Sequence, residues 1–185
     1  MQWFGRRFSV LPTTHILDVG GGEFNWRLLD AKPQLIYLNL SASQPAERWV
    51  IADGRHLPFM ANTFDIVYSN SVIEHLSTYD NQQQFADECR RVGVHIYVQT
   101  PNYWFFVEPH LISPFIHWLP RTWQRRLLRR CTVWGLIARP TQQACDDFLA
   151  EVRLLTAPEM EQLFPDAEII HERFLGFTKS LIAVR

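Results

Sequence analysis

The stretch from Ile16 to Glu23 constrains the fold of this chain most strongly, because it is a short apolar run that ends in an acid and three consecutive glycines. A helical pattern follows at once, with Phe24, Leu28 and Leu29 on one side. A strand that breaks into a glycine turn and then a helix is the first unit of a doubly wound α/β fold. Glycines let a ligand approach the backbone, and a helix N-terminus offers it free N–H groups. Because glycine turns also occur as plain connections, the elements that follow decide the interpretation.

The length and composition of the chain exclude several classes of protein. A length of 185 residues suits one domain, and 47% hydrophobic residues suit a globular core. The net charge of −1 gives no reason to expect a nucleic-acid partner. The three cysteines are too far apart for a CxxC pair, so we expect neither a zinc site nor a disulfide framework. The chain shows neither the apolar core of a signal peptide nor a run of about 18 apolar residues. We therefore expect a cytoplasmic protein, with a peripheral membrane role left open.

Strand and helix patterns alternate along the chain, which predicts a parallel sheet with helices on both faces. The five predicted parallel strands are His15–Val19, Leu35–Leu40, Trp49–Ala52, Ile66–Ser69 and His95–Gln99. A helix is predicted over Tyr79–Val92, because Phe85, Cys89 and Val92 recur at helical spacing. Gly93 follows as its C-terminal cap.

After the fifth strand, residues 101–147 form a proline-rich and aromatic insertion. Alternation resumes with a helix near Ala157–Leu163 and strands at Glu168–Phe174 and Lys179–Val184. The turn at Gly176 is too short for a crossover helix, so this last pair must be antiparallel. The prediction is an α/β, doubly wound, seven-stranded and mostly parallel sheet with one antiparallel strand and a helical insertion after strand 5.

Three ordered motifs, Ile16–Gly22, Ala52–Phe59 and Asn62–Leu76, resemble those of the class I S-adenosylmethionine-dependent methyltransferases, and specifically the type 11 methyltransferase-domain group. The resemblance implies a Rossmann-like methyltransferase fold, with residues 1–185 as a single methyltransferase domain and 101–147 as a substrate-side insertion. It also implies S-adenosylmethionine as the cofactor and S-adenosylhomocysteine as the product. The stretch from Thr100 to His110 further resembles bacterial members encoded with polysaccharide biosynthesis enzymes.

Two departures from the family pattern concern the cofactor. Glu23 and Phe24 stand where the family usually has a further glycine, and Asn39 stands where an acid usually binds the ribose hydroxyls. An amide can accept a hydrogen bond from a hydroxyl but carries no charge, so its bond should be weaker. A non-catalytic relative that serves as a partner subunit therefore stays open as an alternative.

The resemblance also assigns the cofactor-binding positions. They are Asp18, Gly20, Gly21, Gly22, Asn39, Asp53, Gly54, Arg55, Ser69 and Asn70. Asp18 would orient the glycine loop and meet the methionine end of the cofactor, Asn39 would bind the ribose, and Asp53 would accept from the adenine amino group. Backbone N–H groups near Gly54 and Arg55 would meet the ring nitrogens. The serine and asparagine that end the fourth strand lie at the topological switch point, where ligands bind in such sheets.

Methyl transfer to a hydroxyl also requires a group that removes the proton. The candidates are His75, Glu108 and His110, and His110 is preferred because it follows the fifth strand where the acceptor would arrive. For His75 a helix-cap or packing role is favoured over a catalytic one. Together with Glu74 these side chains are of types that bind metals, but their spacing does not require a metal, so no metal site is predicted.

The segment Trp118–Arg139 concentrates positive charge, with six arginines and no acid. It predicts a basic helix with Trp123, Leu127, Cys131 and Trp134 along an apolar stripe. Such a helix suits contact with an anionic membrane, a lid over a phosphate-bearing substrate, or simple packing with a solvated arginine face.

The sequence as a whole predicts a methyltransferase that modifies an oxygen of a small, sugar or lipid-linked acceptor. The alternatives are the non-catalytic partner subunit and a peripheral membrane-binding protein. A nicotinamide-dependent dehydrogenase is disfavoured, because Asn25 stands where its glycine fingerprint requires the third glycine. The acceptor and the oligomeric state stay open.

Overall fold

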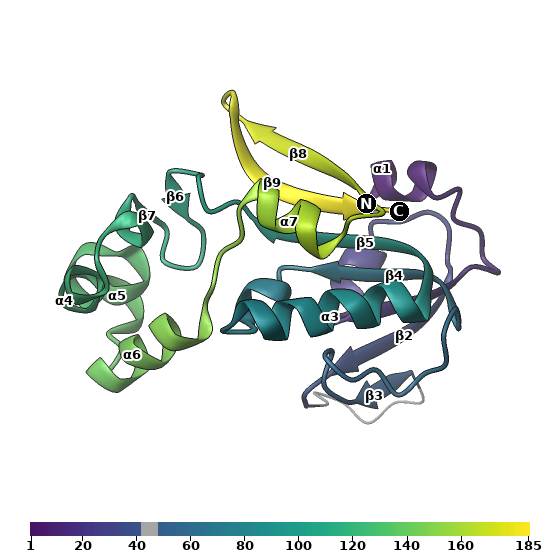
Figure 1. Ribbon diagram of the computed structural model, residues 1–185, viewed down its shortest axis with the longest axis horizontal. Coiled ribbons are helices and arrows are strands. Elements are labelled where there is room, and N and C mark those ends of the chain that lie inside the picture. The colour runs from purple at the N-terminus through teal and green to yellow at the C-terminus, as the bar shows by residue number, and fades with distance from the viewer. Residues whose placement is uncertain (42–47) are drawn as a thin grey trace.

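A computed structural model describes residues 1–41 and 48–185, and its centre is a seven-stranded sheet in the order β3-β2-β1-β4-β5-β9-β8 (Figure 1). The strands are β1 (His15–Val19), β2 (Gln34–Asn39), β3 (Trp49–Ile51), β4 (Phe64–Asn70), β5 (Gly93–Pro101), β8 (Glu168–Phe174) and β9 (Phe177–Val184). Strand β9 pairs antiparallel with both of its neighbours, and the other pairings are parallel. This confirms the predicted sheet and its one reversed strand.

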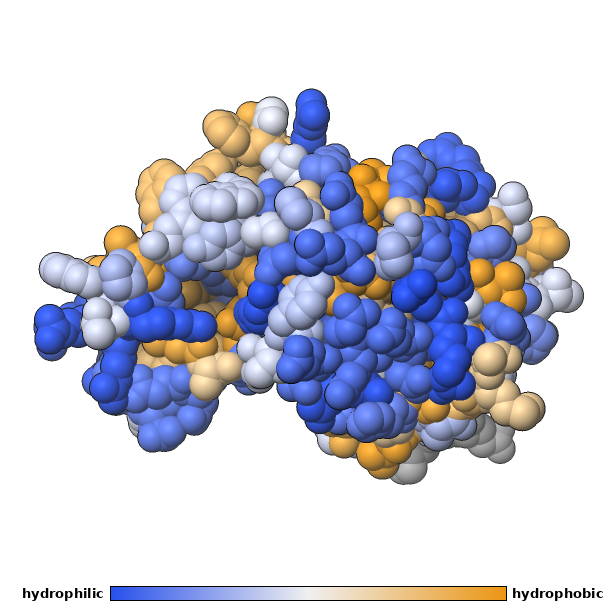
Figure 2. All heavy atoms as spheres, in the orientation of Figure 1, coloured by the Kyte–Doolittle hydropathy of each residue, from blue (hydrophilic) through white to orange (hydrophobic). Residues whose placement is uncertain are grey.

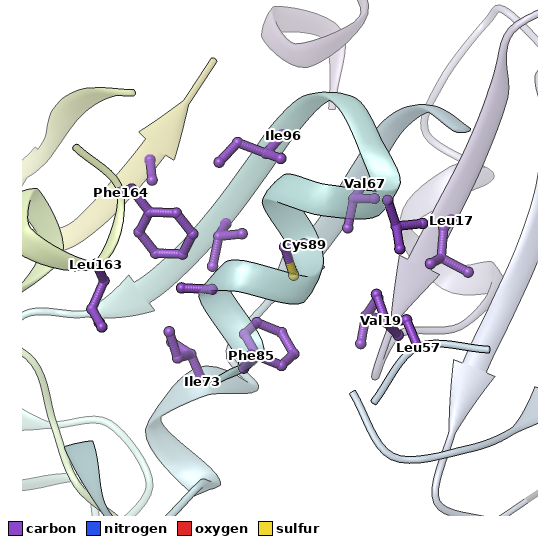
Figure 3. Close-up of a cluster of buried hydrophobic side chains, with 14 of the residues drawn as sticks. Leu17, Val19, Leu57, Val67, Ile73, Phe85, Cys89, Ile96, Leu163 and Phe164 are labelled. Atoms are coloured by element: carbon purple, nitrogen blue, oxygen red, sulfur yellow. The ribbon is translucent and has the colours of Figure 1, made fainter. Parts of the chain in front are cut away.

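Helices α3 (Tyr79–Val92) and α7 (Ala157–Leu163) cover one face of the sheet, with the bounds expected from the sequence (Figure 1). Figure 3 shows Phe85 and Cys89 of α3 in one buried cluster with Leu17, Val19 and Val67 of the sheet. Gly93 ends α3 and begins β5 with extended backbone. A Cβ there would lie 2.6 Å from the His95 carbonyl oxygen, so this glycine serves a close approach and not a left-handed turn.

The other face is covered by the N-terminal segment, with α1 (Gln2–Arg7) and α2 (Glu23–Trp26). Phe4, Trp26 and Tyr68 meet there in edge-on aromatic contacts. The helix predicted after the glycines is only one turn long. Of its predicted apolar side Leu29 is buried, but Phe24 and Leu28 are exposed, and Trp26 is buried in their place. The indole of Trp26 reaches the buried carboxylate of β1, which turns this side of the helix inward.

Residues 102–154, which we call the helical excursion, leave the sheet after β5 and return before α7 (Figure 1). The excursion contains β6 (Val107–Glu108), β7 (Ser113–Pro114), α4 (Arg121–Cys131), α5 (Val133–Ala138) and α6 (Gln142–Glu151), together with the short 3₁₀ helix η2 (Ile116–Trp118). It therefore continues beyond the predicted end at residue 147. Its own small core consists of Leu111, Ile116, Leu128 and Cys145.

The single basic helix predicted within Trp118–Arg139 was wrong, because the chain breaks at Thr132. The hydroxyl of Thr132 accepts a hydrogen bond from the Gly135 N–H at 2.8 Å and so caps α5. The buried positions of α4 are Gln124 and Leu128, one residue along from the predicted stripe. Of the described helices, none combines the length and the apolar character needed to cross a membrane.

Candidate active site

Two cavities lie at the carboxyl edge of the parallel strands, and Ser71 lines both of them. The first cavity has a volume of about 320 Å³, and its lining includes Gly20, Asn39, Asp53, Gly54, Ser71 and His75. The second has a volume of about 750 Å³, and its lining includes Asn70, Ser71, Tyr97, Gln99 and His110. Both lie at the switch point between β1 and β4, where doubly wound sheets bind ligands.

The glycine loop forms one wall of the first cavity. Gly20 has a φ of +78°, and its N–H donates to the Leu38 carbonyl at 2.7 Å. A side chain at this position would also overlap Val72, so the turn requires glycine. Gly21 and Gly22 are not in the lining of the first cavity. Gly21 lies directly over the carboxylate of Asp18, which leaves no room for a side chain.

Asp18 is fully buried beneath this loop and lines neither cavity. The Trp26 indole N–H donates to its Oδ2 at 2.7 Å, while Oδ1 has no partner among the residues that the structure describes. Burial raises the pKa of Asp18 to about 7. Asp18 lies beneath the glycine loop but reaches neither cavity, so its predicted contact with the methionine end of a ligand would have to pass through water.

Asn39 and Asp53 both line the first cavity. Asn39 is the last residue of β2, and Asp53 follows shortly after the end of β3. The Asn39 side-chain amide donates to the Gly21 carbonyl at 3.1 Å, which leaves its Oδ1 to accept from a ligand. Asp53 accepts hydrogen bonds from the backbone N–H and the guanidinium of Arg55, which lower the pKa of its carboxyl group. The Arg55 N–H is therefore occupied, and the expectation that it meets a ring nitrogen was wrong.

Of the two residues that end β4, Ser69 has a structural role and Asn70 lines a cavity. Ser69 is buried, and its hydroxyl donates to the Val19 carbonyl at 3.1 Å, so it links two strands and does not line either cavity. Asn70 lines the second cavity and not the first, apart from Asn39 and Asp53, with which it was predicted to bind the cofactor. Sequence reasoning missed Ser71, whose φ of +58° places it between the two cavities. Its only signal in the sequence is its position directly after a strand.

Sequence reasoning also missed the apolar side chains in the lining of the first cavity. Val72, Leu76 and Phe85 lie there, between the glycine loop and α3. Val72 and Leu76 belong to the third motif, where no role was assigned to them, and Phe85 belongs to the helix stripe that was assigned to packing. Apolar side chains in a core and in a ligand pocket carry the same sequence pattern, so no signal distinguished them.

The three predicted catalytic side chains lie together at the boundary of the cavities. Glu108 accepts a hydrogen bond from His110 Nδ1 at 2.6 Å and one from the Leu111 N–H at 2.6 Å. His75, in the 3₁₀ helix η1 (Ile73–His75), has its Nδ1 at 2.9 Å from Glu151 Oε1. The two imidazole rings are nearly perpendicular, with centroids 4.9 Å apart. The contact with Glu108 raises the pKa of His110.

A third cavity, of about 520 Å³, lies between the helical excursion and the start of α7. Figure 2 shows the surface hollowed between the excursion, on the left, and the sheet body. Glu108, His117 and Arg153 are among its lining residues, and none of the predicted cofactor-binding residues is. It is therefore separate from the glycine loop.

Comparisons with known proteins agree with this geometry. Residues 17–94, somewhat less than half of the chain, match the family model of the methyltransferase domain, and this similarity implies S-adenosylmethionine as the cofactor. The segment contains the glycine loop, Asp53 and His75, but not the helical excursion. No curated protein sequence matches the chain.

Solved structures share the fold at low sequence identity. A SAM-dependent methyltransferase from Methanosarcina mazei has a TM-score of 0.59 and 11% identity, and the match covers 100% of this chain and 96% of that one. A protein from Rhodobacter sphaeroides described as a zinc-dependent alcohol dehydrogenase has a TM-score of 0.64 and 11% identity, over 97% and 87%. A chain in the complex of the Haloferax volcanii Trm112 methyltransferase activator with a methyltransferase has a TM-score of 0.54 and 12% identity, over 98% and 87%.

Proposed function

We propose that the chain transfers the methyl group of S-adenosylmethionine, bound in the first cavity, to an acceptor in the second. The observation that carries this proposal is the meeting of the two cavities at Ser71, next to the glycine loop of the methyltransferase segment. On this proposal residues 1–185 work as one domain, and the helical excursion serves the acceptor. The reacting methyl group lies beside Ser71.

Three side chains or backbone positions hold the cofactor in this proposal. Asp53 accepts from the adenine amino group, Asn39 Oδ1 accepts from a ribose hydroxyl, and the backbone at Gly20 approaches the methionine portion. Each lines the first cavity. The neutral amide of Asn39 gives a weaker ribose bond than a carboxylate would. Affinity therefore depends on Asp53 and on the shape of the glycine loop.

The chemistry needs alignment and exclusion of water more than covalent help, because the sulfonium already activates the methyl group. We propose oxygen as the acceptor atom, on a small, sugar or lipid-linked molecule. The second cavity supports this choice, because its lining combines polar Asn70, Gln99 and Lys179 with aromatic Tyr97 and Phe105. Its volume of about 750 Å³ suits a small molecule.

His110 is the side chain placed to act on the hydroxyl proton of the acceptor. Glu108 is almost fully buried and engages Nδ1, so Nε2 is the nitrogen left for that proton. The negative charge of Glu108 also stabilises a protonated imidazole, in agreement with the raised pKa of His110.

An assay of S-adenosylhomocysteine release over a panel of hydroxylated acceptors tests the proposal. We expect turnover with a hydroxylated acceptor and a loss of roughly 100-fold or more in kcat for His110→Gln, with cofactor affinity unchanged. The exposed His171, on β8, provides the matched control His171→Gln, which should keep full activity. Cofactor binding with no turnover on any acceptor would favour the non-catalytic partner subunit.

A second proposal concerns contact with an anionic membrane through α4 and α5. Leu136 and Ile137 of α5 are 62% and 79% exposed. On α4, Trp123, Arg126 and Arg130 follow one another at helical spacing, and all three are exposed. Exposed apolar and aromatic side chains beside arginines suit an anionic lipid surface.

Co-sedimentation with vesicles tests this contact. We expect sedimentation with phosphatidylserine vesicles but not with phosphatidylcholine vesicles, and its loss in Arg126→Glu/Arg130→Glu. Arg125 is left unchanged because it forms an ion pair with Asp146. The control Arg6→Glu/Arg27→Glu reverses the same number of charges away from α4. Equal sedimentation of all variants would contradict the membrane proposal.

A further inference from the structure

A buried glutamate and two histidines, one histidine lining each of the two cavities, form a cluster of potential metal ligands. Glu74, His75 and His110 each offer a ligand atom, and these atoms lie within 4.8 Å of one another. Glu74 and His75 come from η1, while His110 comes from the excursion, between β6 and β7. The fold therefore brings together residues from two separate parts of the chain.

The strongest sign of a missing ligand is the carboxylate of Glu74, which is fully buried. Its Oε2 accepts a hydrogen bond from the Thr100 hydroxyl at 2.9 Å. Its Oε1 has no hydrogen-bond partner among the described residues, and it lies 3.9 Å from His110 Nε2. An unsatisfied buried carboxylate oxygen is costly, and a bound cation would remove that cost.

Both histidines are already oriented as metal ligands. A carboxylate engages Nδ1 of each ring, Glu151 for His75 at 2.9 Å and Glu108 for His110 at 2.6 Å. This arrangement fixes the proton on Nδ1 and leaves Nε2 as the coordinating atom. Such outer carboxylates are typical of histidines that bind zinc and related ions.

We propose that Glu74, His75 and His110 bind one divalent transition-metal cation, such as Zn²⁺, between the two cavities. Two imidazoles and one carboxylate suit such an ion and leave a coordination position open. Ligands about 2.0–2.1 Å from a tetrahedral ion lie about 3.3 Å from one another. The 3.9 Å between His110 Nε2 and Glu74 Oε1 therefore has to shorten by about half an ångström, and separations of up to 4.8 Å within the cluster by up to about 1.5 Å.

The position of the cluster gives the open coordination site a role. His75 lines the first cavity and His110 lines the second. A hydroxyl that coordinates the cation would be acidified by it, and its proton would pass to water. This consequence rests on the proposed function. While His110 Nε2 coordinates the cation it cannot also take the acceptor proton, so in the metal-bound chain the cation replaces the direct base role of His110. Metal binding itself does not depend on methyl transfer.

Metal titration of the full chain, prepared without a histidine tag and treated with a chelator, tests the proposal. We expect one Co²⁺ per chain with visible absorption bands of a four- or five-coordinate ion, and competition by Zn²⁺ for the same site. Glu74→Gln, His75→Gln and His110→Gln should each weaken Co²⁺ binding at least tenfold. His171→Gln, away from the cluster, should bind as the unaltered chain does.

Two results would overturn the proposal. One is binding of less than one equivalent of either metal by the folded chain, and the other is equal affinity in the cluster variants and in His171→Gln. His75→Gln keeps the test decisive if Glu74→Gln unfolds, because the His75 side chain is 34% exposed. These outcomes are measured without cofactor or acceptor. Metal binding can therefore be absent while methyl transfer is observed, and metal binding can be observed while methyl transfer is absent.

Discussion

The sheet body and the helical excursion bury side chains on different scales. The largest core cluster of the body spans strands β1, β2, β4, β5 and β9 and helices α3 and α7. The excursion depends on four buried side chains, Leu111, Ile116, Leu128 and Cys145. Segments with few buried apolar contacts open at a lower free energy than the rest of a protein. The proposed cofactor site therefore lies on the stiffer region, while His110 and Glu108 lie on the more easily opened one.

Shortening a buried side chain in the sheet body should produce the largest loss of stability. Phe85 is fully buried in the main core and also lines the first cavity. We expect Phe85→Ala to lower the free energy of unfolding by about 3–5 kcal/mol, because it leaves a cavity under α3. Urea unfolding followed by circular dichroism measures this. Phe24→Ala, at a 75% exposed position, is the matched control and should change stability by less than about 0.5 kcal/mol.

Asp18 provides a pH-dependent test of the body. Because its pKa is raised from 3.8 to about 7 in the fold, the native state binds more protons than the unfolded state between these values. This contribution to stability is complete below pH 3.8 and is lost as the pH rises through about 7, by up to about 4 kcal/mol. Asp18→Asn removes this titrating group. The free energy of unfolding of the variant should therefore fall less between pH 5 and pH 8 than that of the unaltered chain. Urea unfolding at both pH values measures the difference, and parallel losses in the two proteins would contradict it.

Shortening a buried side chain in the excursion should destabilise the excursion alone. Leu128 is fully buried in the four-residue cluster. We expect Leu128→Ala to destabilise the excursion by about 2–4 kcal/mol. Hydrogen exchange followed by mass spectrometry should show faster exchange across α4, α5 and α6, with α3 and the sheet unchanged. The control Leu136→Ala, at a 62% exposed position, should leave exchange as it is. Faster exchange throughout the chain would mean that body and excursion unfold together.

The smallest effect is expected at the surface of the excursion. Arg125 donates two hydrogen bonds of 2.7 Å to Asp146, which joins α4 to α6. The Arg125 side chain is 59% exposed, so water and salt screen the pair. Arg125→Ala should lower stability by less than about 1 kcal/mol, measured by urea unfolding at low and high salt. A larger loss would show that ion pairs, and not the four apolar side chains, hold the excursion.

The same contrast explains what the sequence could predict of the fold. In the body, Phe85, Cys89 and Val92 repeat at helical spacing and are all buried, so the bounds of α3 followed from the pattern. In α4 the buried positions include Gln124, whose amide donates to the carbonyls of His117 and Leu119. An apolar pattern cannot identify a buried glutamine. The predicted stripe therefore fell one residue away from the real one.

For the candidate site, the residues at strand ends could be predicted from the sequence, but their hydrogen bonds to nearby residues could not. Gly20, Asn39 and Asp53 lie at or shortly after strand ends and all line the first cavity, while their binding of the cofactor stays a prediction. Arg55 was misjudged because its N–H is taken by a side chain two residues away, a local contact with no sequence pattern. Ser71 was missed because nothing in a sequence distinguishes a left-handed serine from an ordinary one.

Calorimetric titration with S-adenosylhomocysteine tests the central claim, that the first cavity binds the cofactor, most directly. We predict one site per chain with an affinity in the micromolar range, and at least a tenfold loss of affinity in Asp53→Ala. Asp147→Ala, an exposed position on α6, should bind as the unaltered chain does. Absence of binding by the folded chain at high micromolar concentration, or equal affinity in Asp53→Ala, would contradict the account.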